Sequence, residues 1–421
     1  MKSTALFASL VALGGAISSQ ASATNGYFVH GYGIKAQGQA GVSIAQPQDA
    51  LAAANNPAGT VWIGNRLDIG ATLFSPDRSA EIEGNAAGAN GKYDANQKKY
   101  FLLPEIGYSK QLNERLGVGV AVYGNGGMNT DYKHNPYGAF GNTGSAGVDL
   151  AQLFITPSIA YKFTERQSIG VGVNFVYQRF AAKGLGAFAN PVFSSDPDHL
   201  NDRDHDTSTG WGLRLGWQGQ LTDDLTLGLA WSSKIKAREF DRYAGLFADG
   251  GSFDIPENYG AGLSYKLTPA LTVAADVQHI KYGSVRSIAN KFDLSQVFAG
   301  DNFGAKNGPG FGWQDVTVYK LAASYALTPT LTLRGGFSHA DQPVQRRQTF
   351  LNILAPGVIR DHLSVGLTWA VSPEGELSLA YTHGFEETVK GNGSISAAFG
   401  GGEANLKMSQ DILGVAYAWK F

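Results

Sequence analysis

Hydrophobic and polar side chains alternate residue by residue over most of the chain. In Leu225–Trp231, Leu and Trp occupy every second position, and Thr, Gly and Ala lie between them. The same alternation runs from Ile169 to Tyr177, and from Leu413 to the terminal Phe421. A period of two places the two kinds of side chain on opposite faces of a β-strand. The pattern therefore predicts strands that each have one apolar face.

Short and long connections alternate between the predicted strands. Six short polar turns follow an aromatic residue and lead into a new strand, within residues 108–120, 161–171, 217–227, 265–273, 325–333 and 369–377. Seven longer segments rich in Gly, Asn and Asp lie near residues 76–97, 126–148, 182–206, 240–254, 284–312, 342–357 and 389–403. These thirteen connections join fourteen strands. Short turns at one end and long loops at the other are typical of outer-membrane barrels, whose short turns face the periplasm.

Composition agrees with a β-rich membrane protein. The chain has 55 glycines, 18 tyrosines and 23 phenylalanines, and 16% of its residues are charged. Tyrosine and tryptophan cluster at strand ends, where their rings suit the membrane interface. A net charge of -2 gives no basic surface for nucleic acid, and the absence of cysteine excludes disulfides. A soluble β-sandwich would explain the alternation but not the terminal aromatic residue. We therefore predict an all-β fold, a 14-stranded antiparallel transmembrane β-barrel in the outer membrane of a Gram-negative bacterium.

The first residues have the organisation of a secretory signal peptide. Lys2 precedes an apolar run from Ala5 to Ile17, and Ala21–Ala23 is a small-residue cleavage pattern. The apolar run is shorter than the roughly 20 residues that a membrane helix needs. We expect residues 1–23 to be the signal peptide and the mature chain to begin near Thr24.

Residues 24–64 do not alternate, and we expect them to form a separate part of the fold. They are rich in Gly, Ala, Gln and Asn. A 14-stranded barrel is too wide for side chains alone to fill. The segment carries too little charge for a typical disordered tail. We therefore predict a plug inside the lumen, with residues 65–421 forming the barrel around it.

The chain resembles the FadL-type long-chain fatty acid transporters, a family that also includes hydrocarbon-uptake proteins. The resemblance covers essentially the whole mature chain, and its most specific part is the end of the plug at Asn56-Pro57-Ala58. Other matching residues are Gly31, Gly33, Ala40-Gly41, Asp49-Ala50, Gly124–Tyr132, Trp211-Gly212, Leu333–Gly335 and Tyr381–Gly384. The resemblance implies a 14-stranded barrel, an N-terminal hatch that blocks its lumen, and a hydrophobic ligand that exits sideways into the membrane.

Two prolines and a glycine-rich segment suggest where the wall opens. Pro104 and Pro157 lie on the strands before and after the strand that ends in Gly124-Asn125-Gly126-Gly127. Proline donates no ladder hydrogen bond, and glycine permits a kink or bulge. Weak pairing on both sides of this strand would allow a lateral opening, which the resemblance favours. The alternative is that the prolines only mark bulges at the barrel rim.

Two long loops contain more apolar residues than a solvated loop needs. A groove between them would capture a hydrophobic molecule by burying apolar surface. The alternative is a small core that only keeps the loops folded, whereas the resemblance implies a first, low-affinity ligand site. The residues concerned are Leu185, Phe188, Val192, Phe193, Leu246, Phe247 and Phe253.

Several charged residues fall on the lumen-facing side of the alternation. The cations could hold a fatty-acid carboxylate by charge-assisted hydrogen bonds, or they could anchor the hatch. The positions matching the family's carboxylate-contacting basic residues are Gly184 and Gln314, which leaves room for an uncharged hydrocarbon. The candidate lumen charges are Glu105, Arg214, Asp276, Lys320, Arg334 and Arg360.

Two other functions remain as alternatives. A general diffusion porin would need an open lumen, against which the hatch-like N-terminus argues. An outer-membrane hydrolase would need a nucleophile beside a histidine. His279 and His383 lie on the lipid-facing register, and no G-x-S-x-G pattern accompanies them. We therefore predict a non-enzymatic monomer without cofactor or metal, whose partners are a hydrophobic ligand, outer-membrane lipid and lipopolysaccharide, and the outer-membrane barrel assembly machinery.

Overall fold

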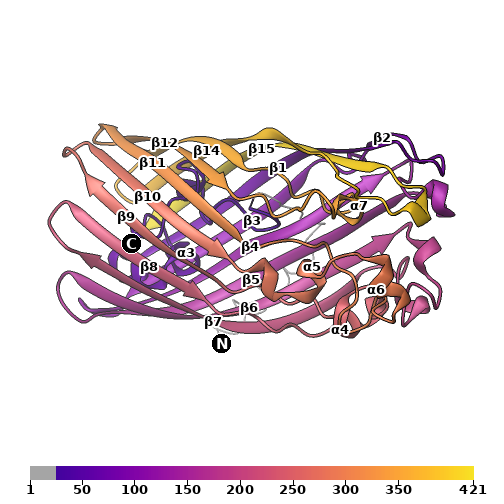
Figure 1. The fold of residues 1–421 in the computed structure, drawn as a ribbon. Helices are drawn as coiled ribbons and strands as arrows, with labels where there is room; N and C mark the ends of the chain where they lie inside the picture. The colour runs from indigo at the N-terminus through magenta and orange to yellow at the C-terminus, as the bar shows by residue number, and fades with distance from the viewer. Residues whose placement is uncertain (1–24) are drawn as a thin grey trace.

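Fourteen antiparallel strands form a closed barrel in the computed structural model, which describes residues 25–421 (Figure 1). The first strand, β1, pairs with the last, β15, from Arg66 opposite Lys420 to Glu83 opposite Glu403, and this seam closes the ring. The short strand β2 pairs with β1 alone, so the ring consists of the other fourteen of the fifteen strands. The strands are β1 (Arg66–Glu83), β2 (Gly91–Asp94), β3 (Phe101–Gln111), β4 (Leu116–Tyr132), β5 (Ala146–Lys162), β6 (Gln167–Lys183), β7 (Asp206–Gln220), β8 (Leu225–Ser232), β9 (Asn258–Lys266), β10 (Leu271–Ile280), β11 (Val316–Thr328), β12 (Leu331–Ala340), β13 (Asp361–Ala370), β14 (Gly375–Val389) and β15 (Glu403–Lys420).

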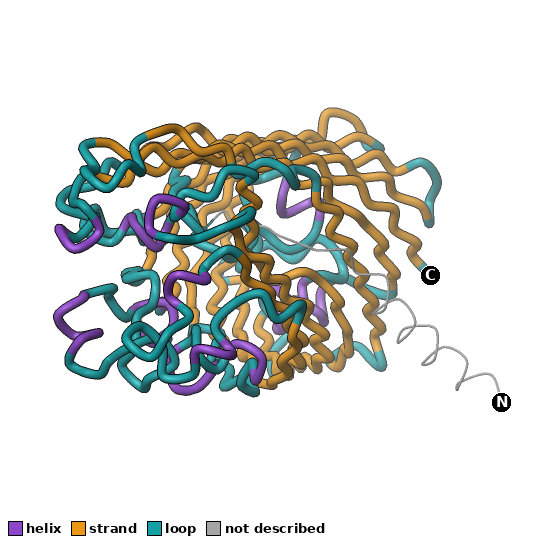
Figure 2. The backbone as a smooth tube through the Cα atoms, turned by 90° about the vertical axis from the view of Figure 1, so that its right-hand side faces the viewer, coloured by secondary structure: helices purple, strands orange, loops and turns teal. Residues whose placement is uncertain are grey.

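Helices are short and lie inside the barrel or in its long loops (Figure 2). Within residues 25–421, no helix has the length and apolar character needed to cross a bilayer. The α-helices are α2 (Ile34–Gln37), α3 (Ala52–Asn55), α4 (Ala248–Gly251), α5 (Arg286–Ala289), α6 (Leu294–Phe298) and α7 (Thr349–Asn352). The 3-10 helices are η2 (Pro57–Trp62), η3 (Gly138–Phe140), η4 (Gly186–Phe188), η5 (Pro197–His199), η6 (Asp241–Tyr243), η7 (Tyr282–Ser284) and η8 (Ala397–Phe399).

The outer surface of the barrel is an apolar belt. Val171, Phe175, Leu229 and Val415 are among the large hydrophobic residues that point outward, and Leu229 is 53% exposed. The inward positions between them are small or polar, such as Gly170 and Asn174. Exposure of such a belt to water costs free energy, whereas contact with lipid acyl chains does not. The belt confirms the two-faced strands predicted from the alternation.

Several strands are longer than the apolar pattern predicts. β1 continues through Pro76 to Glu83, and β4 continues through Gly126 and Gly127 to Tyr132, so the expected loops at 76–97 and 126–148 are partly strand. Beyond the belt the outward residues are polar, as at Asp77 and Asp131. The hydrophobic alternation therefore stops there, although the hydrogen-bonded ladder continues. Among the fourteen strands of the ring, the length ranges from 8 residues in β8 to 18 residues in β1 and β15.

The chain before β1 fills the lumen near the short-turn end, where α3 lies in Figure 1. We call residues 25–64 the hatch. Helix α2 contacts β13, β14 and β15, α3 contacts β4 and β5, and η2 contacts β4 to β7. The predicted plug is therefore inside the barrel. The predicted signal peptide and the mature start at Thr24 lie outside the described residues.

Candidate functional site

Glycines give the hatch its compact turns. A Cβ on Gly31 would lie 2.7 Å from the Cα of Gly41, so the two backbone segments can meet only because both residues lack side chains. Gly33, with φ of 91°, adopts a conformation that favours glycine, and a Cβ there would lie 2.9 Å from a carboxylate oxygen of Asp49. The residues that the resemblance singled out thus fold the hatch upon itself.

The Asn56-Pro57-Ala58 segment joins the hatch to the wall. The side chain of Asn56 caps η2 by accepting a hydrogen bond from the Ala58 amide, and it donates to the carbonyls of Ile44 and Trp217, at 2.8 and 3.0 Å. Pro57 begins η2, where a missing N–H costs nothing. The opposing wall position is Gly170, where a Cβ would lie 2.3 Å from the Ala58 nitrogen.

Carboxylates of the wall hold backbone amides of the hatch. Glu105 on β3 accepts from the amides of Gly33 and Ile34, at 3.2 and 3.0 Å. Asp276 on β10 accepts from Ser43 and Ile44, at 2.7 and 3.1 Å. In both cases one carboxylate binds two consecutive N–H groups, and such charge-assisted bonds are stronger than neutral ones. The two predicted lumen anions therefore bind the hatch.

Three of the four candidate lumen cations also contact the hatch. Arg214 donates to the Asn55 carbonyl at 3.2 Å, Lys320 donates to the carbonyls of His30 and Gly41, and Arg334 donates to the side chain of Gln48 at 2.8 Å. These cations therefore match the anchoring interpretation left open by the sequence.

Arg360 differs from the other candidate cations. It precedes β13 and donates to the Ala340 carbonyl at 3.1 Å, beside the His339 ring. Arg360 lies beyond the end of its strand, at the loop end of β12 and β13, so the lumen-facing alternation does not apply to it. Unlike the other three cations, it contacts wall residues at that end.

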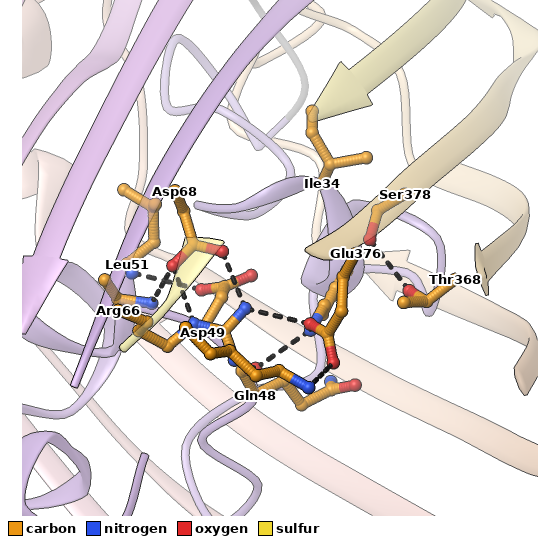
Figure 3. A network of polar contacts seen from close by, with 12 residues as sticks. Ile34, Gln48, Asp49, Leu51, Arg66, Asp68, Thr368, Glu376 and Ser378 are labelled. Atoms are coloured by element: carbon orange, nitrogen blue, oxygen red, sulfur yellow. Dashed lines mark hydrogen bonds and ion pairs between the residues drawn. The ribbon is translucent and has the colours of Figure 1, made fainter. Parts of the chain in front are cut away.

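A network of ion pairs links the hatch to the two sides of the barrel seam (Figure 3). Arg66 on β1 forms a two-point contact with Asp68, with both distances 2.8 Å, and also reaches Glu376 on β14 at 3.1 Å. Lys35 of the hatch binds Glu376 at 2.6 Å. Asp49 lies in the same network, where burial, followed by the negative charge of Asp68, raises its pKa to about 6. Lys35, Arg66, Asp68 and Glu376 were not singled out from the sequence, although Asp68 and Glu376 occupy the inward register of their strands.

The wall has a window between β3 and β4. Pairing of these strands runs from Gln111 opposite Gly117 only as far as Ile106 opposite Val122. Within the described chain, no residue of β4 pairs with residues 101–105 of β3. The ring is therefore closed below this point, near the short turns, whereas residues 101–105 of β3 have no partner on β4.

The hatch covers the β4 edge of this window. The Gly127 amide donates to the Tyr27 carbonyl, and the Val29 amide donates to the Asn125 carbonyl, both at 3.0 Å. A Cβ on Gly126 would lie 2.0 Å from the Tyr27 carbonyl oxygen, so glycine allows this close approach. Residues 27–29 thus act as a short substitute strand.

The predicted prolines lie near the window but act differently. Pro104 pairs with Ala71 of β1 but lies on the part of β3 that has no partner on β4, as expected from its missing N–H group. Pro157 pairs in register with Val120 of β4 and instead interrupts the β5–β6 ladder between Ile155 and Ser158. The expectation of weak pairing on both sides of β4 is therefore wrong for the β5 side, where a bulge between Gly124 and Gly126 is the one irregularity within the described strand pair.

A small cavity of about 30 Å³ lies just inside the window. Tyr32 of the hatch lines this cavity, and its hydroxyl donates a hydrogen bond to the Asn125 side chain at 2.5 Å. A volume of this size holds only a few water molecules, so the lumen is blocked at this level. Lining residues from the wall include Phe74, Leu103, Pro104, Tyr123, Gly124 and Ile412.

The apolar loop residues meet at the opposite end of the barrel from the short turns. A second cavity, of about 40 Å³, is lined by Leu185, Phe188, Leu246 and Phe247, and its lining, all within the described chain, contains no charged side chain. Phe193 packs against Phe188 with the ring centroids 5.5 Å apart. The two loops named from the sequence therefore share one apolar cavity. Residues that sequence reasoning missed complete it: Val148, Phe180, Leu200, Phe303, Phe311, Leu351 and Leu354.

A closed apolar-belted barrel blocked by its own N-terminal segment defines a class of outer-membrane channel. The chain belongs to a family within this class: the model described as outer membrane protein transport protein (OMPP1/FadL/TodX) matches residues 14–421. The protein is therefore an outer-membrane protein of a transport family, and a general porin is not favoured.

Known relatives and solved structures match most of the chain at low sequence identity. The chain is 24% identical to outer membrane protein P1 of Haemophilus influenzae, over 77% of this chain and 75% of that protein. It is 24% identical to the long-chain fatty acid transport protein of Salmonella typhi, over 82% and 83%. The crystal structure of the Pseudomonas putida toluene transporter TodX superposes with a TM-score of 0.70 at 19% identity, covering 94% of this chain and 100% of that one.

Proposed function

We propose that the protein carries small hydrophobic molecules, long-chain fatty acids or hydrocarbons, through the outer membrane by passive diffusion. The ligand first enters the apolar loop cavity, passes along the lumen above the hatch, and leaves sideways through the window between β3 and β4. The observation that carries this proposal is the interrupted β3–β4 pairing. The proposal divides the chain into a signal peptide (1–23), a hatch (24–64) and a barrel (65–421), and takes the protein to act as a monomer.

The chemistry of the window supports a gated exit. Unpaired backbone groups facing lipid cost several kcal/mol each, so an empty gap in a membrane wall is unstable. Tyr27 and Val29 supply the missing hydrogen bonds to β4. Withdrawal of this segment therefore opens the window at an energetic cost, which a hydrophobic ligand offsets by filling the space.

The charges of the lumen favour ligands without a strongly held head group. Arg214, Lys320 and Arg334 donate to the hatch, so a carboxylate would have to compete with those contacts. The loop cavity is lined by apolar residues and Ser287. Within the proposed class, this arrangement favours an uncharged hydrocarbon over a fatty acid.

The proposal assigns no catalytic role to the histidines on the outer wall. His279 lies 3.6 Å from Asp315, and His383 lies 2.8 Å from Asp411, each on the outward register.

Assembly of the barrel by the outer-membrane assembly machinery is part of the same proposal.

Closing the window should stop transport while the barrel stays folded. We expect Gly124→Val with Gly127→Val to reduce uptake of radiolabelled toluene and oleate by cells at least about tenfold, because bulky β-branched residues fill the kinked edge of β4. Folding is checked by the mobility shift of unheated barrel in gels. Gly335→Val is the matched control, since a Cβ there has one neighbour within 4 Å, at 3.7 Å, and it should transport normally. Normal uptake by the folded double variant would refute the lateral route.

A further inference from the structure

Charged side chains gather on the outward face of β4, β5 and β6 at their loop ends. On β6, outward Tyr177, Arg179 and Lys183 alternate with buried Gln178, Phe180 and Ala182, so the cluster continues the lipid-facing register. Long loops mark the end of a barrel that faces the exterior. We call this group the rim cluster: Lys98, Asp131, Asp149, Arg179, Lys183 and His205.

The carboxylates of the rim cluster lie beneath its cations. Asp149 is surrounded by His205, Lys98 and Arg179, at 3.1, 3.5 and 3.8 Å. Lys183 lies 2.8 Å from Asp131. The two carboxylate side chains are 12% and 21% exposed, whereas those of the four basic residues are 26–47% exposed. The surface that the cluster presents is therefore positive, and the buried acids hold the cations in place.

Large apolar side chains lie directly below the cluster. Phe175 stands opposite Ile155 on β5 and Trp211 on β7, and all three are exposed, Trp211 by 64%. Tyr177 follows Phe175, and Arg179 follows Tyr177, each two residues and about 7 Å further along the strand. Aromatic residues followed by cations mark the level where acyl chains give way to lipid head groups.

We propose that the rim cluster binds a phosphorylated glycolipid of the outer leaflet, lipopolysaccharide. Lys98, Arg179 and Lys183 would hold its phosphates by charge-assisted hydrogen bonds, and Phe175 and Trp211 would pack against its acyl chains. Asp202 and Asp204 precede His205, Asp206 follows it at the start of β7, and all three carry the opposite charge.

The site adjoins the window. Lys98 belongs to the segment between β2 and β3, and the neighbouring Ala95 and Gln97 hydrogen-bond to Asp131 on β4, above the unpaired part of β3. A lipid bound by Lys98 would therefore lie at the upper border of the proposed exit. This inference names a partner and does not depend on the transported ligand.

Binding of purified lipids tests the site. The probes are bisphosphorylated lipid A, the same lipid without phosphates, and phosphatidylglycerol, each titrated against the detergent-solubilised full chain by native mass spectrometry. We expect the wild-type protein to bind bisphosphorylated lipid A at least about tenfold more tightly than either other lipid, because several charge-assisted bonds are involved. Equal binding of dephosphorylated lipid A, or of phosphatidylglycerol, would overturn the proposal.

A charge-matched pair of variants locates the site. The triple variant Lys98→Gln, Arg179→Gln and Lys183→Gln should bind bisphosphorylated lipid A at least about tenfold more weakly than wild type. The control carries the same loss of charge at the short-turn end, through Lys110→Gln, Arg115→Gln and Lys266→Gln, which are all exposed, and should bind like wild type. Undiminished binding by the triple variant, or equal loss in the control, would overturn the proposal. The dephosphorylated lipid provides a test on the wild-type chain even if the triple variant folds poorly.

Discussion

Single buried charges determine how firmly the hatch is held. The carboxyl of Asp49 accepts a hydrogen bond from the Leu51 amide, and its pKa rises from 3.8 to about 6, chiefly because of burial and then because of Asp68. A raised folded-state pKa of an acid means that the docked hatch binds more protons than the released hatch between these two pH values. The contribution of Asp49 to docking is therefore complete below about pH 4 and is lost as the pH rises through 6. His30, whose pKa burial lowers, has the opposite dependence, so only a comparison between variants isolates Asp49.

The variant Asp49→Asn should remove this pH dependence while keeping the hydrogen bond from Leu51. Relative to wild type, its hatch should become more stable as the pH rises from 4 to 7, by on the order of 2–3 kcal/mol, since one pKa unit is worth about 1.4 kcal/mol. Hydrogen exchange of the hatch amides, measured for both proteins at each pH, gives the difference. A difference that stays constant with pH would show that Asp49 has the same pKa in the docked and released hatch.

At the scale of elements, the hatch and the wall fit because wall glycines make room for hatch backbone. Gly170 on β6 faces the start of η2, where a Cβ would lie 2.3 Å from the backbone of both Pro57 and Ala58. Backbone cannot rotate away as a flexible side chain can, so the helix as a whole has to shift. The position of η2 therefore depends on one missing methyl group.

We expect Gly170→Ala to destabilise hatch docking by about 1–3 kcal/mol, the usual cost of overpacking. Limited proteolysis of the folded barrel should then cleave the hatch faster than in wild type. The control is Gly335→Ala, whose new methyl group would have a single neighbour, at 3.7 Å. Equal cleavage of the two variants would mean that the hatch tolerates the displacement.

Strands could be predicted from the sequence, whereas their ends and the contacts of the hatch could not. Alternation identified the fourteen strands because one face of each meets lipid. It failed beyond Pro76 and at Gly126, because the outward residues there are polar, as at Asp77 and Asp131, while buried residues such as Ile82 and Met128 face inward. Glu105 and Asp276 were recognised as lumen-facing, but their partners, consecutive amides of the hatch, lie far away in sequence. The one-sided window also escaped prediction, since Pro157 disturbs the ladder on the side away from β4.

At the scale of the whole molecule, the hatch occupies the lumen of the barrel and contacts its wall on several sides. Wall carboxylates, wall cations and the ion pair between Lys35 and Glu376 bind the hatch at many separate points. The cavity between the hatch and the window has a volume of about 30 Å³. A fourteen-stranded ring without the hatch would enclose a water-filled lumen.

Wild-type protein in a planar bilayer should show no large steady conductance, whereas a variant lacking residues 25–64 should conduct steadily, because ions then pass straight through the lumen. The gel mobility shift establishes that the deletion variant is folded, and the β1–β15 seam gives it the means to close. Large steady conductance by the intact protein would contradict a blocked lumen and revive the porin alternative.

The unequal strand lengths make the outer mouth of the barrel oblique. β15 has 18 residues and β8 has 8, so β15 is ten residues longer, which corresponds to about 33 Å of strand. The tall side, including β5 and β6, supplies Val148 and Phe180 to the loop cavity, and the loops above the low side supply Phe247 and Phe311. A hydrophobic molecule in this cavity would therefore contact rigid strand backbone on one side of the barrel and loop residues on the other.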